Sequence, residues 1–394
     1  MSKKQQPAEK SINFMSQRFV AIICSAILLV ASLGSLAING LNFGLDFTGG
    51  LQVEARYENP ADLEQVRDTL AQSGISDAVV VFFGSDRDLK ITTQQSREGI
   101  VSSQLAQQID GALSESITLD IVRGSDDPSL PQGGLVLTFN QANAAQQQAA
   151  DQVFSQLGLK NYRVTPLKDT AFTIVSSDGL QTLTELLLVD VLEKSTDGSV
   201  NVKRTEFVGP QIGDELRDQG GIGMMFALAV VMLYVAMRFQ FKFSVAAVAA
   251  LVHDVLIVLG FFSLTGLDFD LTVLAAVLAV IGYSLNDTIV VSDRIRENFR
   301  KIRKSSSTEV VNISLTQTLG RTLVTSLTTM LVLLALFFVG GELIHAFSIA
   351  LIIGIFIGTY SSIYVAANIL LFMNITKEDL IVPVKEGAEF DEMP

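Results

Sequence analysis

The stretch LTVLAAVLAVIGYSLNDTIVV, residues 271–291, contains one acidic residue, Asp287, among side chains that are almost all apolar or small. About 20 such residues are enough for a helix to cross the hydrocarbon core of a membrane. A carboxylate at that depth costs roughly 2.5–3.5 kcal/mol even on the lenient insertion scale. We therefore expect either proton or ion traffic through Asp287, or a quiet ion pair between Asp287 and a basic residue on a neighbouring helix.

Six apolar runs of near-spanning length lie in this chain of 394 residues, which is 49% hydrophobic. They are residues 19–38, 222–237, 243–264, 271–291, 323–339 and 347–373. The runs at 222–237 and 323–339 are short for about 30 Å of hydrocarbon, so we expect their helices to include flanking polar residues. The composition predicts a membrane α-helical bundle of six spans plus a globular domain between the first two.

The acidic excess of the chain belongs to that domain. Residues 41–218 hold 13 Lys/Arg and 26 Asp/Glu, and 13 − 26 = −13 equals the net charge of the whole chain. Such a surface repels phosphates, so we expect no nucleic-acid partner. Lys and Arg flank alternate ends of the spans, whereas the loops at 265–270 and 340–345 contain neither. The positive-inside rule then places both termini in the cytoplasm and the large domain outside it.

The predicted organisation follows from these spans and charges. We expect a cytoplasmic N-terminus at 1–18, a first transmembrane helix at 19–39, an external domain at 40–218, five transmembrane helices within 219–373 with a cytoplasmic loop at 292–320, and a cytoplasmic tail at 374–394. Ser35 and Ala37 fit a small-x-small cleavage pattern, but the apolar run exceeds a typical signal core, so we expect an uncleaved anchor. The sole cysteine, Cys24, lies in that run, so the external domain is expected to use no disulfides.

The external domain is internally repeated, with two halves offset by about 84 residues. The first half predicts strand 51–57, helix 60–74, strands 78–83 and 89–92, helix 101–113 and strand 117–122. The second predicts strand 135–140, helix 141–158, strands 162–166 and 172–175, helix 180–193 and strand 200–207. The order βαββαβ is typical of a ferredoxin-like unit. We expect an α+β domain of two such units, about 47–124 and 133–208, in tandem or with exchanged strands, joined by a linker at 125–132.

The fold alone assigns no activity. Residues 41–218 contain no histidine, and we find no nucleophile–base arrangement and no metal-ligand spacing there. We expect no enzyme, no cofactor and no metal site, and a binding or mechanical module instead. The glycine-rich stretch GLDFTGG at 44–50 lacks the Lys and the spacing of a P-loop. It predicts a tight junction between a helix and a strand, where glycine permits positive φ and Asp46 can bond backbone amides.

Polar residues in the other spans suggest partners for Asp287. At about 1.5 Å rise per residue, Asp287 lies about 24 Å from Leu271 and Arg321 about 27 Å from Val339, so the two share a depth. One hypothesis is a fixed ion pair that sets helix register. The other is a proton relay in which Asp287 gains and loses a proton while Arg321 controls its proton affinity.

Other side chains of these spans could support a relay. His253 and Asp254 lie near the middle of the third span, as part of a relay or as a satisfied core pair. The side chains of Ser284, Asn286 and Thr288 could hold water or pass on hydrogen bonds. By contrast, Asp293, Arg294, Arg296 and Glu297 have i, i+3 and i+4 spacings that predict a solvated, salt-bridged helix beyond the fourth span.

Four motifs resemble those of the SecF family of protein-export membrane proteins, part of the SecD/SecF group in the resistance-nodulation-division superfamily. They are GLDFTGG at 44–50, FVGPQIGDEL at 207–216, GYSLNDTIVVSDRIRENFRKIR at 282–303 and LTQTLGRTLVTS at 315–326. The resemblance implies that Asp287 and Arg321 are the proton-relay residues. It also implies that Asp46, Gly49, Gly50, Gly209 and Pro210 form a family-motif junction. Many members carry one ferredoxin-like unit in the external domain, whereas this sequence predicts two.

The resemblance also implies a function. It suggests a non-enzymatic accessory subunit of the Sec protein translocase, in the bacterial inner membrane, that acts with SecD and the SecYEG translocon on a translocating polypeptide. The external domain at 40–218 would then be a periplasmic domain. Protons would drive it, through the proton-motive force, at late stages of export. Two alternatives remain open: a proton-coupled exporter of small molecules or lipids from the same superfamily, and a passive scaffold in which Asp287 and Arg321 merely pair.

Overall fold

The computed structural model describes residues 11–110, 118–123, 135–140, 144–159, 162–167, 171–176, 179–302, 305–341, 344–376 and 379. The chain forms two compact units. We call Leu45–Arg217 the sheet unit, and Met1–Gly44 together with Asp218–Pro394 the helical unit. The predicted linker at 125–132 lies outside the described residues.

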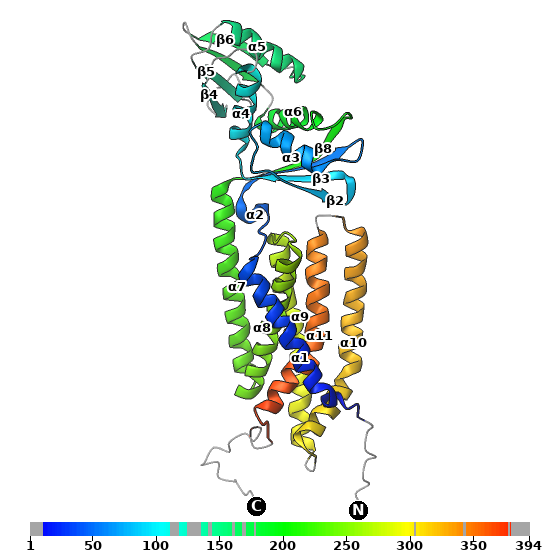
Figure 1. Cartoon of the computed structure of the whole chain (residues 1–394). Coiled ribbons are helices and arrows are strands. Elements are labelled where there is room, and N and C mark those ends of the chain that lie inside the picture. The colour runs from blue at the N-terminus through cyan, green and yellow to red at the C-terminus, as the bar shows by residue number, and fades with distance from the viewer. Residues whose placement is uncertain are drawn as a thin grey trace, which may run out of the picture. The chain divides into compact units, whose positions relative to one another are not determined.

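Six helices among the described residues are long and apolar enough to cross a membrane (Figure 1). They are α1 (Arg18–Ile38), α7 (Pro210–Arg238), α8 (Phe241–Thr265), α9 (Leu271–Lys301), α10 (Ser307–Val339) and α11 (His345–Phe372), and the 3-10 helix η1 (Phe14–Gln17) precedes α1. The prediction of a six-helix bundle is confirmed at this level.

The helices extend beyond their apolar runs. The short runs include flanking polar residues as expected, because α7 begins at Pro210 and α10 begins at Ser307. The segment 292–320, expected as a loop, is mostly helical, since α9 continues to Lys301. Charged residues at i+3 and i+4 spacings pair along this extension and favour helix over loop.

Small residues bring the helices of the helical unit close together. Helix α11 packs against α8, α9 and α10. A Cβ atom added at Gly354 of α11 would lie 2.1 Å from the Val280 side chain of α9, and one at Gly358 would lie 3.1 Å from Ser284. This small-xxx-small spacing permits close backbone approach between membrane helices. It brings the polar residues of α9 and α11 within hydrogen-bonding range.

The sheet unit contains two four-stranded antiparallel sheets. The first has the order β2 (Val79–Phe83), β3 (Ser85–Thr93), β1 (Gly50–Tyr57), β8 (Val200–Val208). The second has the order β4 (Thr118–Arg123), β5 (Leu135–Asn140), β7 (Ala171–Ser176), β6 (Tyr162–Leu167). The helices of this unit are α2 (Leu45–Thr48), α3 (Leu63–Gln72), α4 (Arg97–Asp110), α5 (Ala144–Gln156) and α6 (Leu180–Glu193).

The two halves exchange their closing strands. Strand β4, the last of the first half, pairs with β5, and β8, the last of the second half, pairs with β1. Helix α6 spans both cores, because Leu183 packs in the core of the second sheet and Val191 in that of the first. Of the two arrangements left open by the sequence, the structure has exchanged strands.

Glycines allow a close junction where β1 meets the start of α7. Gly49 and Gly50 have φ of 67° and 115°, values that L side chains rarely adopt. A Cβ atom on Gly50 would lie 2.2 Å from the Thr93 carbonyl oxygen, and one on Gly49 would lie 2.9 Å from Cα of Pro210. The tight turn expected from the glycine-rich stretch is therefore present.

The remaining motif residues flank this junction. Gly209 precedes Pro210, and proline suits the first turn of a helix because an N–H there has no intrahelical partner. Asp46 lies half-buried in the first turn of α2.

Candidate functional site

Asp287 lies in α9 with its side chain 8% exposed. Thr322 Oγ1, on α10, donates a hydrogen bond to Oδ1 at 2.7 Å, and Ser362 Oγ, on α11, donates to Oδ2 at 2.5 Å. Each carboxylate oxygen thus has a hydroxyl partner from a different helix. A hydroxyl can donate to a carboxylate and can also accept from a protonated carboxyl. The site can therefore hold Asp287 with or without a proton.

Arg321 lies at the depth predicted from the sequence, because its neighbour Thr322 contacts Asp287. The Arg321 side chain is nevertheless exposed, and within the described part of the chain no ion pair joins it to Asp287. Successive helical residues point in directions about 100° apart, since 3.6 residues make a turn. Helix α10 therefore presents Thr322 to the carboxylate and turns Arg321 away. The Arg321 charge still acts on Asp287 through space. The contact ion pair considered from the sequence is absent here.

His253 and Asp254, on α8, form a second buried polar site. They are 3% and 0% exposed, and His253 Nδ1 lies 2.8 Å from Asp254 Oδ1. Ser284 Oγ of α9 and Ser361 Oγ of α11 both donate to Asp254 Oδ2, at 2.5 and 2.7 Å. The pair is thus held from three helices.

Consecutive serines connect the two carboxylates. Ser361 donates to Asp254 and Ser362 donates to Asp287, so one turn of α11 contacts both acids. On α9, Ser284 contacts Asp254 and lies three residues before Asp287. The two sites are therefore neighbours in one polar layer of the helical unit.

Of the three supporting residues expected from the sequence, only Ser284 makes a side-chain hydrogen bond to one of the two acids. Ser284 joins the polar layer. The Asn286 side chain is exposed and makes no hydrogen bond to another described residue. Thr288 is buried, and its Oγ1 has no hydrogen-bond partner among the described residues.

Sequence reasoning missed the hydroxyl partners of the two acids. Thr322 and Ser362 contact Asp287, and Ser361 contacts Asp254. The contact of Ser25, on α1, with His253 was missed as well. A signal was available in the sixth apolar run, where TYSS at 359–362 places four hydroxyl groups in succession among aliphatic residues.

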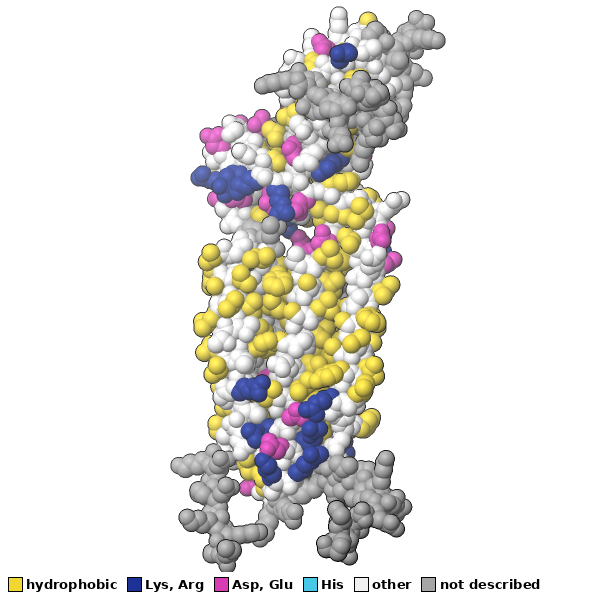
Figure 2. Space-filling model, turned by 180° about the vertical axis from the view of Figure 1, so that it is seen from behind, with side chains coloured by type: hydrophobic (Ala, Val, Ile, Leu, Met, Phe, Trp, Pro, Cys, Tyr) yellow, Lys and Arg dark blue, Asp and Glu magenta, His cyan; other side chains and the backbone are white. Residues whose placement is uncertain are grey.

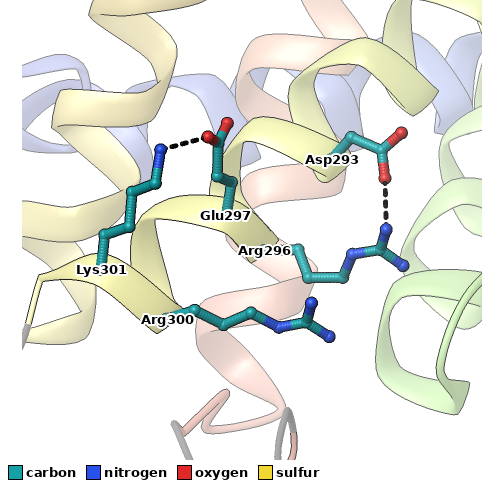
Figure 3. Close-up of a pocket in the computed structure, with 5 residues that line it drawn as sticks. All are labelled: Asp293, Arg296, Glu297, Arg300 and Lys301. Carbon is teal, nitrogen blue, oxygen red and sulfur yellow. Dashed lines mark hydrogen bonds and ion pairs between the residues drawn. The ribbon is translucent and has the colours of Figure 1, made fainter.

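Charged side chains gather at one end of the helical unit, beyond the hydrophobic belt (Figure 2). Asp293 pairs with Arg238 at 2.8 Å and with Arg296 at 3.1 Å, and Arg294 pairs with Glu297 at 2.9 Å. Figure 3 shows that Lys301 also reaches Glu297, beside a shallow pocket. Surface ion pairs of this kind contribute little to stability, so a substitution of one of these charged residues should leave the protein folded. They make a solvated, salt-bridged helix, as the spacing predicted.

Within the described ranges, no three His, Cys, Asp or Glu side chains gather as metal ligands. What the polar layer offers is exchangeable protons in two hydrogen-bonded sets: the Asp254 carboxyl with the His253 imidazole and two serine hydroxyls, and the Asp287 carboxyl with two hydroxyls.

Comparison with known proteins adds a family. The family described as "Protein export membrane protein SecD/SecF, C-terminal" matches residues 188–376, and "SecD/SecF GG Motif" matches residues 34–61. The "Protein translocase subunit SecF" of Pseudomonas aeruginosa is 42% identical to this chain, over 95% of each sequence. That of Vibrio alginolyticus is 40% identical, over 98% of each.

A solved structure is also similar. The crystal structure of SecDF from Thermus, a translocon-associated membrane protein, matches with a TM-score of 0.63 and 29% identity over 94% of this chain. This chain spans 40% of the length of that SecDF chain.

Proposed function

This chain belongs to the SecF family of protein translocase subunits, and from that premise we propose that it uses proton movement at Asp287, together with SecD, to promote late stages of protein export. It is an accessory subunit of the Sec translocase. The partner SecYEG and a translocating polypeptide complete the assembly in which it would act, and we infer the bacterial inner membrane as its location. No enzymatic step is needed for this role.

One observation carries the proposal: the buried carboxyl of Asp287 is held by two hydroxyls and by no contacting cation. Thr322 and Ser362 can serve either protonation state of the carboxyl. A buried carboxylate in direct contact with Arg or Lys would instead be fixed in its charged form. The geometry therefore supports a group that exchanges protons rather than one that only holds helices together.

Arg321 acts at a distance in this proposal. It follows Gly320 and precedes Thr322 on α10, so any rotation or shift of α10 changes both the Arg321 charge and the Thr322 hydroxyl at Asp287. Loss or gain of a proton at Asp287 would thus favour different positions of α10 relative to α9. This is a physical route from proton passage to helix movement.

The sheet unit is the part we propose to face the translocating polypeptide in the periplasm, with both termini in the cytoplasm. We further propose that each sheet with its helices is a ferredoxin-like unit, the two sharing closing strands. The exchanged pairing of β4 and β8 supports a mechanical role, because force on one half reaches both sheets through backbone hydrogen bonds.

The test is export of a secreted precursor into membrane vesicles that contain the full translocase, with and without a proton gradient. We expect Asp287→Asn and Arg321→Met to lose the gradient-dependent part of export while the basal part remains. The matched control is Asp293→Asn, the same substitution in the same helix at a solvated ion pair. Full gradient dependence in stably expressed Asp287→Asn would overturn the proposal.

The same vesicles distinguish the exporter alternative. A proton-coupled exporter of small molecules or lipids would leave precursor export intact in Asp287→Asn. A passive scaffold would also leave precursor export intact in Asp287→Asn.

A further inference from the structure

The buried pair His253–Asp254 belongs to a chain of hydrogen bonds that reaches beyond Asp254 to α1. We call this set the His253 cluster: His253 and Asp254 of α8, Ser25 and Ala21 of α1, Ser284 of α9, and Tyr360 and Ser361 of α11. All of these residues lie in the helical unit. The proposed function assigns no task to His253, although it is one of only 2 histidines in the sequence.

Six contacts hold the cluster together. His253 Nε2 lies 3.2 Å from Ser25 Oγ, and Ser25 Oγ lies 3.1 Å from the Tyr360 hydroxyl. Tyr360 donates to the Ala21 carbonyl oxygen at 2.7 Å. The other three contacts are those of Asp254 with His253 Nδ1, Ser284 and Ser361.

Counting protons shows what the pair must hold. Each contact needs one proton, and a carbonyl oxygen can only accept. Tyr360 therefore gives its proton to Ala21, and Ser25 must give its own to Tyr360. Ser25 is then an acceptor toward His253, so Nε2 carries a proton. The contact between Nδ1 and Asp254 needs a further proton, because the protons of Ser284 and Ser361 are already used in the bonds that these serines donate to Asp254 Oδ2.

The pair thus holds two protons and has zero net charge. The shared proton lies either on Nδ1, giving an imidazolium beside a carboxylate, or on Asp254, giving two neutral groups. Zero net charge suits side chains that are 3% and 0% exposed in a span, where an isolated charge is costly. If the pair held one proton fewer, Ser25 would have to turn and donate to Nε2. The contact between Ser25 and Tyr360 would then lack a proton.

We propose that the His253–Asp254 pair is a second proton-binding site, and that the hydrogen bond between Ser25 and Tyr360 forms when the pair holds two protons and breaks when it holds one. On release, the Nε2–H bond breaks and the proton passes to water. Ser25 then reverses its hydrogen bond and donates to Nε2, so α1 loses the bond from Ser25 to the Tyr360 hydroxyl of α11 and keeps only the bond from Tyr360 to the Ala21 carbonyl oxygen. Binding of the second proton by the pair therefore strengthens the contact between α1 and α11, and release of that proton weakens it.

Among the described residues, few other titratable groups surround the pair. Cys24 of α1 acts on Tyr360, the Tyr364 ring of α11 packs at a tilt against Tyr360 with centroids 5.4 Å apart, and Asp287 of α9 lies beyond Ser284. No Lys or Arg of the described chain forms an ion pair with Asp254. A link between this site and Asp287 through Ser361 and Ser362 rests on the proposed function, whereas the proton count does not.

The test is ¹⁵N NMR of histidine in the full-length chain, reconstituted with its partner subunit in phospholipid bilayers. A His345→Gln background leaves His253 as the single histidine, so its two ring nitrogens are read directly. We expect Nε2 to carry a proton at neutral pH. In Tyr360→Phe, Ser25 is free to donate to Nε2, so we expect the ratio of unprotonated to protonated Nε2 at the same pH to rise about tenfold.

Tyr364→Phe is the matched control, since it removes a hydroxyl one turn away that makes no bond in the cluster; it should leave the protonation of His253 Nε2 at neutral pH unchanged. An unprotonated Nε2 at neutral pH in the unmodified cluster would overturn the proposal. Equal protonation of Nε2 in the Tyr360→Phe and Tyr364→Phe variants would overturn it as well. Because the readout is not export, failure here and failure of the proposed function are separate results.

Discussion

Two buried aspartates, Asp88 in the sheet unit and Asp287 in the helical unit, are held by different kinds of partner. Asp88 is 7% exposed and accepts two hydrogen bonds from Arg56 and one from Lys203, all at 2.7 Å. The Arg56 guanidinium holds the pKa of Asp88 well below its usual range, with help from Lys203 and Ser85. Asp287 receives hydroxyl donors alone. Contacting cations fix one carboxylate as a structural charge, whereas hydroxyls leave the other able to exchange a proton.

The largest expected effect is on gradient-dependent export, and it should appear when the substitution Asp→Asn is made at Asp287 but not when it is made at Asp88. We expect Asp287→Asn to reduce gradient-dependent export by about a hundredfold or more, as for loss of a proton-transfer group, with little change in thermal stability. Asp88→Asn should lower the unfolding temperature of the sheet unit and leave the gradient dependence unchanged. Both variants are measured for export in vesicles and for thermal unfolding. Loss of gradient dependence in Asp88→Asn would break the comparison.

A smaller effect should follow from removing the hydroxyl partners of Asp287. Thr322→Val and Ser362→Ala each remove a hydrogen bond of about 1 kcal/mol, so each should change gradient-dependent export roughly fivefold. Ser348→Ala is the matched control, because Ser348 is also a buried serine of α11 and donates to the Ile344 carbonyl oxygen instead of to an acid. Vesicle export measures all three variants. Equal export in Ser348→Ala and Ser362→Ala would contradict a role for the Ser362 hydroxyl at Asp287.

The acid stability of the sheet unit should depend on Asp88. A carboxyl with a lowered pKa stabilises the folded state above its unfolded pKa of about 3.9, and that stability is lost as the pH falls toward the folded value. The chain should therefore lose sheet-unit stability below about pH 4. Asp88→Asn should flatten this part of the profile. Hydrogen exchange of the β1 and β3 amides against pH is the measurement, and an unchanged slope in the variant would contradict the assignment.

The smallest effect should come from replacing each arginine by lysine. Arg56 donates through two nitrogens to both oxygens of Asp88, a geometry that lysine cannot reproduce, so Arg56→Lys should destabilise the sheet unit measurably. Arg321 acts on Asp287 as a distant charge, so Arg321→Lys should retain most gradient-dependent export. Thermal unfolding tests the first variant and vesicle export the second. Loss of export in Arg321→Lys would mean that the guanidinium shape matters there.

Much of the fold could be predicted because local pattern and local structure agree. Strand β5 and helix α6 have the bounds expected from their sequence periodicity. The glycine pair at Gly49 and Gly50 was predicted as a tight turn for its φ angles, and the structure adds close contacts with Thr93 and Pro210. These features depend on residues near one another in the chain.

Features that depend on distant pairing could not be predicted in the same way. Strand β4 could have paired with β1 or β5 with the same alternation of residues, so its exchange had no local signal. Depth alone placed Arg321 and Asp287 together, but the 100° step between helical neighbours decided that Thr322 makes the contact. Ser25 contacts His253 although the two are 228 residues apart in the sequence, so only the packed bundle defines this contact.

The most direct measurement is the protonation of Asp287 itself, by infrared difference spectroscopy of the reconstituted complex after a pH jump. We predict a carboxyl band that appears on acidification, is missing in Asp287→Asn and persists in Asp88→Asn. If Asp287→Asn removes no pH-dependent carboxyl band, Asp287 does not exchange a proton, and the account of a proton-driven SecF subunit is contradicted.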